Sequence, residues 1–176
     1  SIDLGAKIAR ATKAAMGENY PDSAVDDVLF WMESKGRLGR KAKAGFFSYD
    51  AQGKRLGYWE GLNAQYPLTA QQPDLIDVQH RLIFVQSLEA VRALEEGVLM
   101  DIREGDVGAI LGWGFAPWSG GPFSWLDILG SPYAAERCDQ LQHAYGDRFA
   151  CPDLLRSMAS KGQSFYGQAK KAQSAA

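Results

Sequence analysis

The feature that most constrains this sequence is a repeated eight-residue pattern. Residues 29–36 read LFWMESKG, and residues 155–162 read LRSMASKG. Just upstream, residues 15–20 match residues 144–149, and the two matches occur in the same order. Each copy closes on a glycine of the kind that ends a helix. Two ordered matches of this kind predict an internal duplication, which limits the chain to a fold built from two related units.

The two copies differ in what surrounds them. An aromatic pair follows each, Phe46-Phe47 and Phe165-Tyr166, but only the first copy has a basic loop before its pair. A long apolar stretch precedes the second copy. The first copy begins at Ser1, with no equivalent stretch before it. We therefore expect a truncated first repeat whose own long helix lies upstream of Ser1.

Hydrophobic periodicity predicts a mostly helical chain. Apolar residues recur at helical spacing and glycine or proline punctuates the segments, which predicts helices over residues 2–16, 24–35, 73–97, 104–111, 123–129, 131–145 and 152–161. Residues 46–49 predict a strand, and the following turn predicts a hairpin. The expected fold class is all-α with a small β-hairpin. Its expected parts are the end of the first helical repeat (1–56), a connector with little regular structure (57–72), the second repeat (73–167) and a frayed tail (168–176).

Composition excludes several function classes. The chain has 46% hydrophobic and 23% charged residues and a net charge of −2, which is typical of a globular domain and gives no overall field for nucleic acid or anionic membranes. No apolar run reaches the ~20 residues of a membrane span, and no signal peptide is evident, so we expect an intracellular, cytoplasmic protein. Two cysteines and two histidines lack metal-ligand spacing and predict reduced thiols near the core, with no metal site.

One basic loop stands out as a candidate binding segment. Residues 36–45 place Arg37, Arg40, Lys41 and Lys43 between glycines. Clustered cations of this kind could contact the phosphates of coenzyme A or of a nucleotide. The alternative is a solvated loop whose glycines serve turn geometry, and the sequence favours that alternative.

Other candidate residues also carry two interpretations. His80 could act as a base or ligand, but a partly buried helix histidine is the favoured interpretation. Asp127, close to Gly130, is expected to cap or bond a turn. The aromatic residues of segment 112–125 could line an acyl pocket, but packing between the repeats is favoured because large aromatic side chains dominate such contacts; they are Trp113, Phe115, Trp118, Phe123 and Trp125.

Three segments resemble the C-terminal domain of 3-hydroxyacyl-CoA dehydrogenases. Residues 36–49, GRLGRKAKAGFFSY, resemble that family's closing signature, roughly G-R-x-G-x-K-x-G-x-G-F-[YW]-x-Y, with departures at Ala42 and Ala44. Residues 81–97 resemble its long helix, and residues 112–130 resemble its G-x-G-F…G-G-P-F…D-x-x-G stretch. The resemblance covers most of residues 1–167 and is nearest to the tandem-repeat form found in multifunctional fatty-acid β-oxidation proteins.

The resemblance implies a fold and a reaction. The fold would be similar to the C-terminal domain of 6-phosphogluconate dehydrogenase. The parent protein would oxidise a 3-hydroxyacyl-CoA to the 3-ketoacyl-CoA with NAD, and this helical part would close over the acyl-CoA. The family's His–Glu pair and its G-x-G-x-x-G loop have no counterpart here. We therefore assign no catalytic, cofactor-binding or metal residue, and expect NAD to be bound outside this chain by an upstream nucleotide-binding domain of the same polypeptide.

Activity and association follow from the same expectations. The fragment alone is expected to be inactive. Val25, Val28, Leu29 and Met32 form an apolar helix face whose partner would lie on the missing long helix, which predicts a homodimer unless residues 73–97 cover that face. Two other functions remain open, a purely structural interaction module and the helical domain of another hydroxy-acid dehydrogenase. A nucleic-acid module built on the basic loop ranks third.

Overall fold

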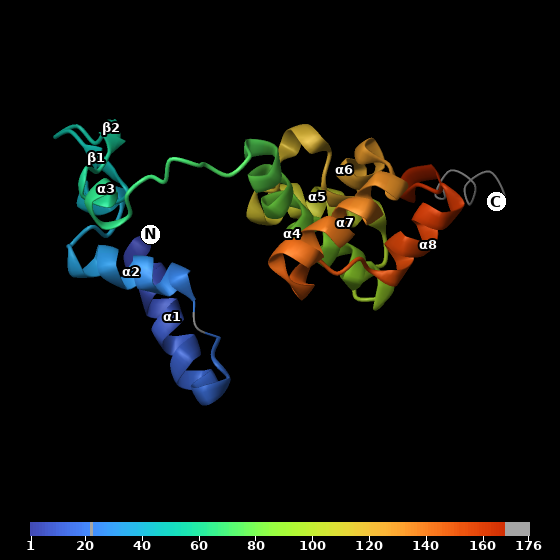
Figure 1. Ribbon diagram of the computed structural model, residues 1–176, viewed down its shortest axis with the longest axis horizontal. Helices are drawn as coiled ribbons and strands as arrows, with labels where there is room; N and C mark the ends of the chain where they lie inside the picture. The colour runs from blue at the N-terminus through green and yellow to red at the C-terminus, as the bar shows by residue number, and fades with distance from the viewer. Residues whose placement is uncertain (22, 168–176) are drawn as a thin grey trace. The chain divides into compact units, whose positions relative to one another are not determined.

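The computed structural model describes residues 1–21 and 23–167, which form two compact units, Ser1–Gln72 and a second that begins at Pro73 (Figure 1). The expected frayed tail, 168–176, lies outside the described residues. The prediction of a helical fold with one small hairpin is confirmed. The first unit contains α1 (Ile2–Met16), η1 (Gly17–Asn19), α2 (Ala24–Ser34), η2 (Arg40–Ala42), β1 (Phe47–Tyr49), β2 (Arg55–Tyr58) and α3 (Gly61–Gln65). The second contains α4 (Leu75–Glu95), α5 (Ile102–Trp113), η3 (Pro117–Ser119), α6 (Pro122–Leu129), α7 (Ser131–Tyr145), η4 (Asp147–Phe149) and α8 (Asp153–Lys161).

The first unit is organised by the packing of α1 on α2. Gly5 permits a close approach, because a Cβ there would lie 3.3 Å from a methyl group of Leu29. Ser23 caps α2, its Oγ accepting from the Val25 amide at 3.2 Å, as the sequence predicts. At the other end of the contact Arg10 donates to both carboxylate oxygens of Glu33. The short side chains of α1 thus let α2 bury its inner face.

The apolar face of α2 is covered in part within its own unit. Met32 is fully buried, Val28 and Leu29 are partly buried, and Val25 is 65% exposed. The expectation that this face lacks a partner unless the long helix or a second molecule supplies one is therefore wrong for its inner residues, because α1 packs against it. Association into a homodimer stays a prediction.

The segment expected to be an irregular connector contains regular structure. Strands β1 and β2 pair antiparallel with Phe47 opposite Tyr58, and their rings stack at a centroid distance of 4.5 Å. Helix α3 follows, and Trp59 and Tyr66 both pack on Trp31 of α2 at 5.3 Å. The sequence signal was weak because α3 is a single short turn of helix held by aromatic contacts rather than by periodicity.

The second unit is a helical bundle with one continuous core. Helix α4 runs through it and contacts α6, η4 and α8, while α7 packs along α8 (Figure 1). The core consists of buried side chains from α4, α6, α7, η4, α8 and the helical turn at residue 165: Phe84, Leu88, Val91, Phe123, Trp125, Leu126, Ala134, Cys138, Leu141, Phe149, Leu155, Met158 and Phe165. In α5, Ala109 and Asp106 are buried as well. Both cysteines are free, with Cys138 buried and Cys151 partly buried, as predicted.

Two carboxylates tie backbone segments of this bundle together. Asp106 is 3% exposed and accepts from the amides of Phe123 at 2.8 Å and Ser124 at 3.1 Å, which satisfies the N-terminus of α6. Gly121 must be glycine, because its φ is +114° and a Cβ would lie 2.5 Å from Asp106. Asp127 accepts from the amides of residues 165 and 166 at 2.8 and 2.9 Å, so its predicted turn-bonding role is confirmed.

The predicted repeat is visible as the same succession of local structures. Each copy has a helix, a glycine at positive φ (Gly17 and Gly146), a three-residue 3-10 turn and a second helix. Each second helix ends at a left-handed glycine (Gly36 and Gly162). The following amide donates to the repeated methionine's carbonyl, at 3.0 Å in the first copy and 2.9 Å in the second. Both copies are therefore helix, turn, helix, as predicted.

The copies diverge after that glycine. Phe47 lies in strand β1, paired with β2, whereas Phe165 and Tyr166 begin a helical turn. The difference has a physical cause. In the second copy Asp127 accepts the two backbone amides and fixes the turn, while in the first copy a returning strand takes the backbone bonds.

Candidate functional site

The first predicted phosphate contact, Arg37, is directed into its own unit. Its Nε donates to the Gly45 carbonyl at 2.7 Å, and its Nη2 donates to the Phe47 carbonyl at 3.0 Å and to Ser48 Oγ at 3.3 Å. The guanidinium also lies 4.3 Å from the ring centroid of Trp59. Partial burial lowers the pKa of Arg37. The side chain thus fastens the basic loop to β1, and few of its donors remain for a ligand.

Lys43 is engaged in a similar way. Its backbone is left-handed, with φ of +51°, and its Nζ donates to the carbonyl of Ala51 in the hairpin turn. That conformation is unusual for a residue with a Cβ, so the loop holds it in place. One donor of this exposed amine is therefore engaged by the turn.

The remaining two predicted residues, Arg40 and Lys41, are exposed on η2. Arg40 lines a shallow cavity of about 340 Å³ with Tyr49, Lys54 and Arg55. The structure thereby brings two further cations to Arg40 that the sequence analysis missed. They follow the turn in the chain, and only the antiparallel pairing of β1 and β2 places them beside the loop.

A second polar cluster centres on Asp77 in α4. Its carboxylate accepts from Arg137 Nη2 at 2.6 Å and from the Tyr145 hydroxyl at 2.6 Å, and lies 3.6 Å from Arg81 Nε. The Tyr145 hydrogen bond, followed by that of Arg137, lowers the pKa of Asp77. The same bond raises the pKa of Tyr145. This cluster joins α4 to the middle and the C-terminal end of α7.

His80 belongs to the edge of this cluster and of the core. Its Nδ1 accepts from Arg137 Nε at 3.1 Å, and its ring packs edge-on against Phe84, Trp125 and Tyr133. Burial, and then the charge of Arg137, lower the pKa of His80. The favoured interpretation of a partly buried helix histidine is confirmed, because its acceptor is occupied by an arginine and its ring is packed.

The aromatic segment divides between core and surface. Phe115, Phe123 and Trp125 are buried within the second unit, whereas Trp113 and Trp118 are 62% and 74% exposed. The prediction that the whole segment packs between repeats is thus wrong for the buried members, because Phe123 and Trp125 fill the core of a single unit. Asp106 accepts from the first amides of α6, and Phe123 and Trp125 of that helix face the core. Periodicity over so short a segment does not indicate this burial.

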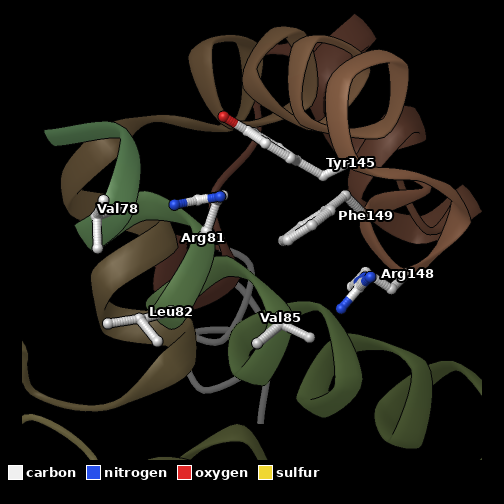
Figure 2. A pocket seen from close by; sticks show the side chains of 7 residues that line it. All are labelled: Val78, Arg81, Leu82, Val85, Tyr145, Arg148 and Phe149. Carbon is white, nitrogen blue, oxygen red and sulfur yellow. The ribbon is translucent and has the colours of Figure 1, made fainter. Parts of the chain in front are cut away.

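A groove opens between α4 and the α7–η4 corner of the second unit (Figure 2). Its volume is about 320 Å³. The lining combines aliphatic, aromatic and guanidinium groups from the two sides, namely Val78, Arg81, Leu82, Val85, Tyr145, Arg148 and Phe149. No sequence pattern indicates this groove, since its walls come from segments about 60 residues apart.

Other kinds of site are absent from the described part of the chain. Residues 1–21 and 23–167 contain no cluster of three or more His, Cys, Asp or Glu side chains able to hold a metal ion. Within the same residues, no helix is both long and apolar enough to cross a bilayer. The single sheet is a two-stranded antiparallel hairpin, so these residues do not provide the parallel strand, glycine-rich loop and helix that bind a dinucleotide.

Comparison with known proteins gives one consistent result. The chain is similar to proteins named fatty acid oxidation complex subunit alpha, at 39% identity over 166 residues in Shewanella loihica, 38% over 169 in Shewanella amazonensis and 36% over 169 in Vibrio vulnificus. Each match includes 94% of this chain but 23% of the relative, so the chain spans about a quarter of the length of the curated relatives it matches. No family model matches the chain.

Proposed function

We propose that this chain, which is homologous to a segment of the fatty acid oxidation complex subunits alpha, is the helical part of an NAD-dependent 3-hydroxyacyl-CoA dehydrogenase. The similarity to those subunits along 94% of the chain carries this proposal. The duplicated helix–turn–helix supports it, since the dehydrogenase resemblance implies tandem helical repeats. The parts of the chain would then be the end of a first repeat, a connector and a second repeat, within a longer cytoplasmic polypeptide.

In this proposal the chain shapes the substrate site without supplying its reactive groups. The described residues do not fit NAD, so the cofactor would be bound by another domain of the longer polypeptide. His80 would take no catalytic part, since its Nδ1 accepts from Arg137 and its ring packs against Phe84. The helical units would close over the acyl-CoA and exclude water, which strengthens electrostatic interactions in a closed site.

The basic loop retains a reduced role in coenzyme A binding. Arg37 and Lys43 bond to backbone carbonyls, so Arg40 and Lys41 are the predicted cations that remain available to a phosphate, with Lys54 and Arg55 beside Arg40. Titration of coenzyme A into the chain, followed by amide NMR, tests this point. Arg40→Gln should abolish shifts around the hairpin, and unchanged shifts would remove the loop from the proposal.

A chimera tests the proposed activity. This chain would replace the corresponding segment of the Shewanella loihica subunit, and NADH formation from a 3-hydroxyacyl-CoA would be followed by absorbance. The expected result is dehydrogenase turnover by the chimera and none by this chain alone. The Asp106→Ala chimera, in which the second unit is weakened, is the matched control. A folded chimera that binds NAD but produces no NADH would refute the proposal and favour a purely structural module.

A further inference from the structure

The groove between α4 and the α7–η4 corner carries an inference that is independent of the dehydrogenase proposal. Its α4 wall is a continuous apolar stripe, because Val78, Leu82 and Val85 recur at i, i+4 and i+7. The opposite wall is the edge formed by Tyr145 and Phe149 (Figure 2). Leu82 is 62% exposed, so a large part of this apolar stripe is in contact with water.

Two guanidiniums border this apolar surface. Arg148 projects beside the groove, and among the described residues it has no carboxylate partner; its nearest aromatic contact is the Phe149 ring, 5.9 Å from its Cζ. Arg81 lies 4.5 Å from the Tyr145 ring centroid, and its Nε is 3.6 Å from Asp77. The groove therefore presents at least one arginine whose donors are free of an anionic partner.

The charged side chains that line the groove are both cationic, those of Arg81 and Arg148. Asp77, beside Arg81, already accepts from Arg137 and Tyr145 at 2.6 Å each. Asp147, next to Arg148 in the chain, accepts from the Gln142 amide at 3.1 Å. An anion entering the groove would meet an uncompensated positive field beside low-dielectric walls, where charge pairing is stronger than in open solvent.

We propose that this groove binds a small organic anion with an apolar body. The head group, a carboxylate or a phosphate monoester, pairs with Arg148 and secondarily with Arg81, since the planar guanidinium fork matches both oxyanions. The apolar body lies along Val78, Leu82 and Val85. The volume of about 320 Å³ is at the lower end of the range typical of ligand pockets, which suits a short-chain ligand.

Calorimetry with three probes distinguishes the contributions of the anionic head group and of the apolar tail to the affinity. Octanoate carries both, acetate carries only the head group and octanol only the tail, and each is titrated into the whole chain below its aggregation concentration. Octanoate is expected to bind at least tenfold more tightly than either partial probe. Octyl phosphate in a parallel titration distinguishes the two head groups. Equal affinity for octanol and octanoate would overturn the proposal, because the groove would then be a merely apolar surface.

Variants localise the binding. Arg148→Gln should weaken octanoate binding by about tenfold or more, as expected when a charge-assisted hydrogen bond is lost. Arg103→Gln, an exposed arginine of the same unit paired with Asp101, is the matched control and should leave the affinity unchanged. Leu82→Trp should block the groove. Its exposed site keeps the risk to folding low, and the circular dichroism spectrum checks this.

NMR of the methyl groups decides between a ligand and a second molecule. Octanoate should shift the signals of Val78 and Val85, and Arg148→Gln should reduce that response. Unchanged octanoate affinity in Arg148→Gln would overturn the proposal. It would also be overturned if the same methyl signals moved with protein concentration alone, because a second copy of the chain would then be the occupant.

Discussion

The carboxylate of Asp106 offers the sharpest test of how the second unit is held together. It is 3% exposed and accepts hydrogen bonds from two amides, from Ser124 Oγ at 2.6 Å and from the Tyr166 hydroxyl at 2.8 Å. The bonds reach from α5 to the start of α6 and to the C-terminal turn. Replacing the residue with alanine therefore disconnects three segments at one point.

The magnitude follows from the donors left behind. The two hydroxyls can rotate towards other acceptors, but the amides of Phe123 and Ser124 are fixed at the first turn of α6. A buried donor without a partner costs about 1–3 kcal/mol. Two such amides predict a loss of about 2–6 kcal/mol in the free energy of unfolding for Asp106→Ala, a large share of an ordinary domain's stability of about 5–15 kcal/mol.

Urea unfolding and hydrogen exchange measure this loss. Because the chain forms two units, exchange of the α6 amides reports the second unit separately from any global transition. Asp101→Ala is the matched control. Asp101 caps the start of α5, the helix that contains Asp106, its Oδ1 accepting from the Arg103 amide at 2.8 Å. Its side chain is 32% exposed, far more than that of Asp106, and removing such a cap costs about 1 kcal/mol. If Asp106→Ala were no more destabilising than Asp101→Ala, the reasoning from buried donors would be refuted.

Three further outcomes are expected. Gly121→Ala should destabilise the second unit by more than about 2 kcal/mol, because strain at a forbidden φ is combined with a steric clash. Gly108→Ala, at a helical position with open space around it, should be neutral or stabilising. Thermal melts of both variants measure the difference. The pKa of Asp77 is lowered in the folded state. Its contribution to stability is therefore present above the unfolded pKa of about 4 and is lost as the pH falls below that value. Asp77→Asn should flatten this part of the stability–pH curve, and an unchanged curve would contradict the expectation. Met32→Ala and Met158→Ala, equivalent buried positions of the repeat, should each cost about 2–5 kcal/mol in their own unit, and a cost confined to one of them would contradict structural equivalence.

Helix boundaries and the repeat were readable from the sequence because local chemistry decides them. Gly36 and Gly162 take left-handed backbone angles that close a helix wherever they occur. Ser23 needs only the two residues after it to cap α2. The doubled pattern with its buried methionines therefore predicted helix, turn, helix in both copies without any long-range information.

The tertiary structure alone decided which charged groups are available. Arg37 and Arg40 are equivalent cations in the sequence, but only the return of the β1 strand provides carbonyls that engage Arg37. Arg148 and Val78 are 70 positions apart, and the groove they share exists because the α7–η4 corner packs against α4. Local patterns report backbone preferences within a few residues, whereas the partner of a charge and the walls of a groove depend on contacts between distant segments. Those contacts form only when the helices bury their apolar faces together.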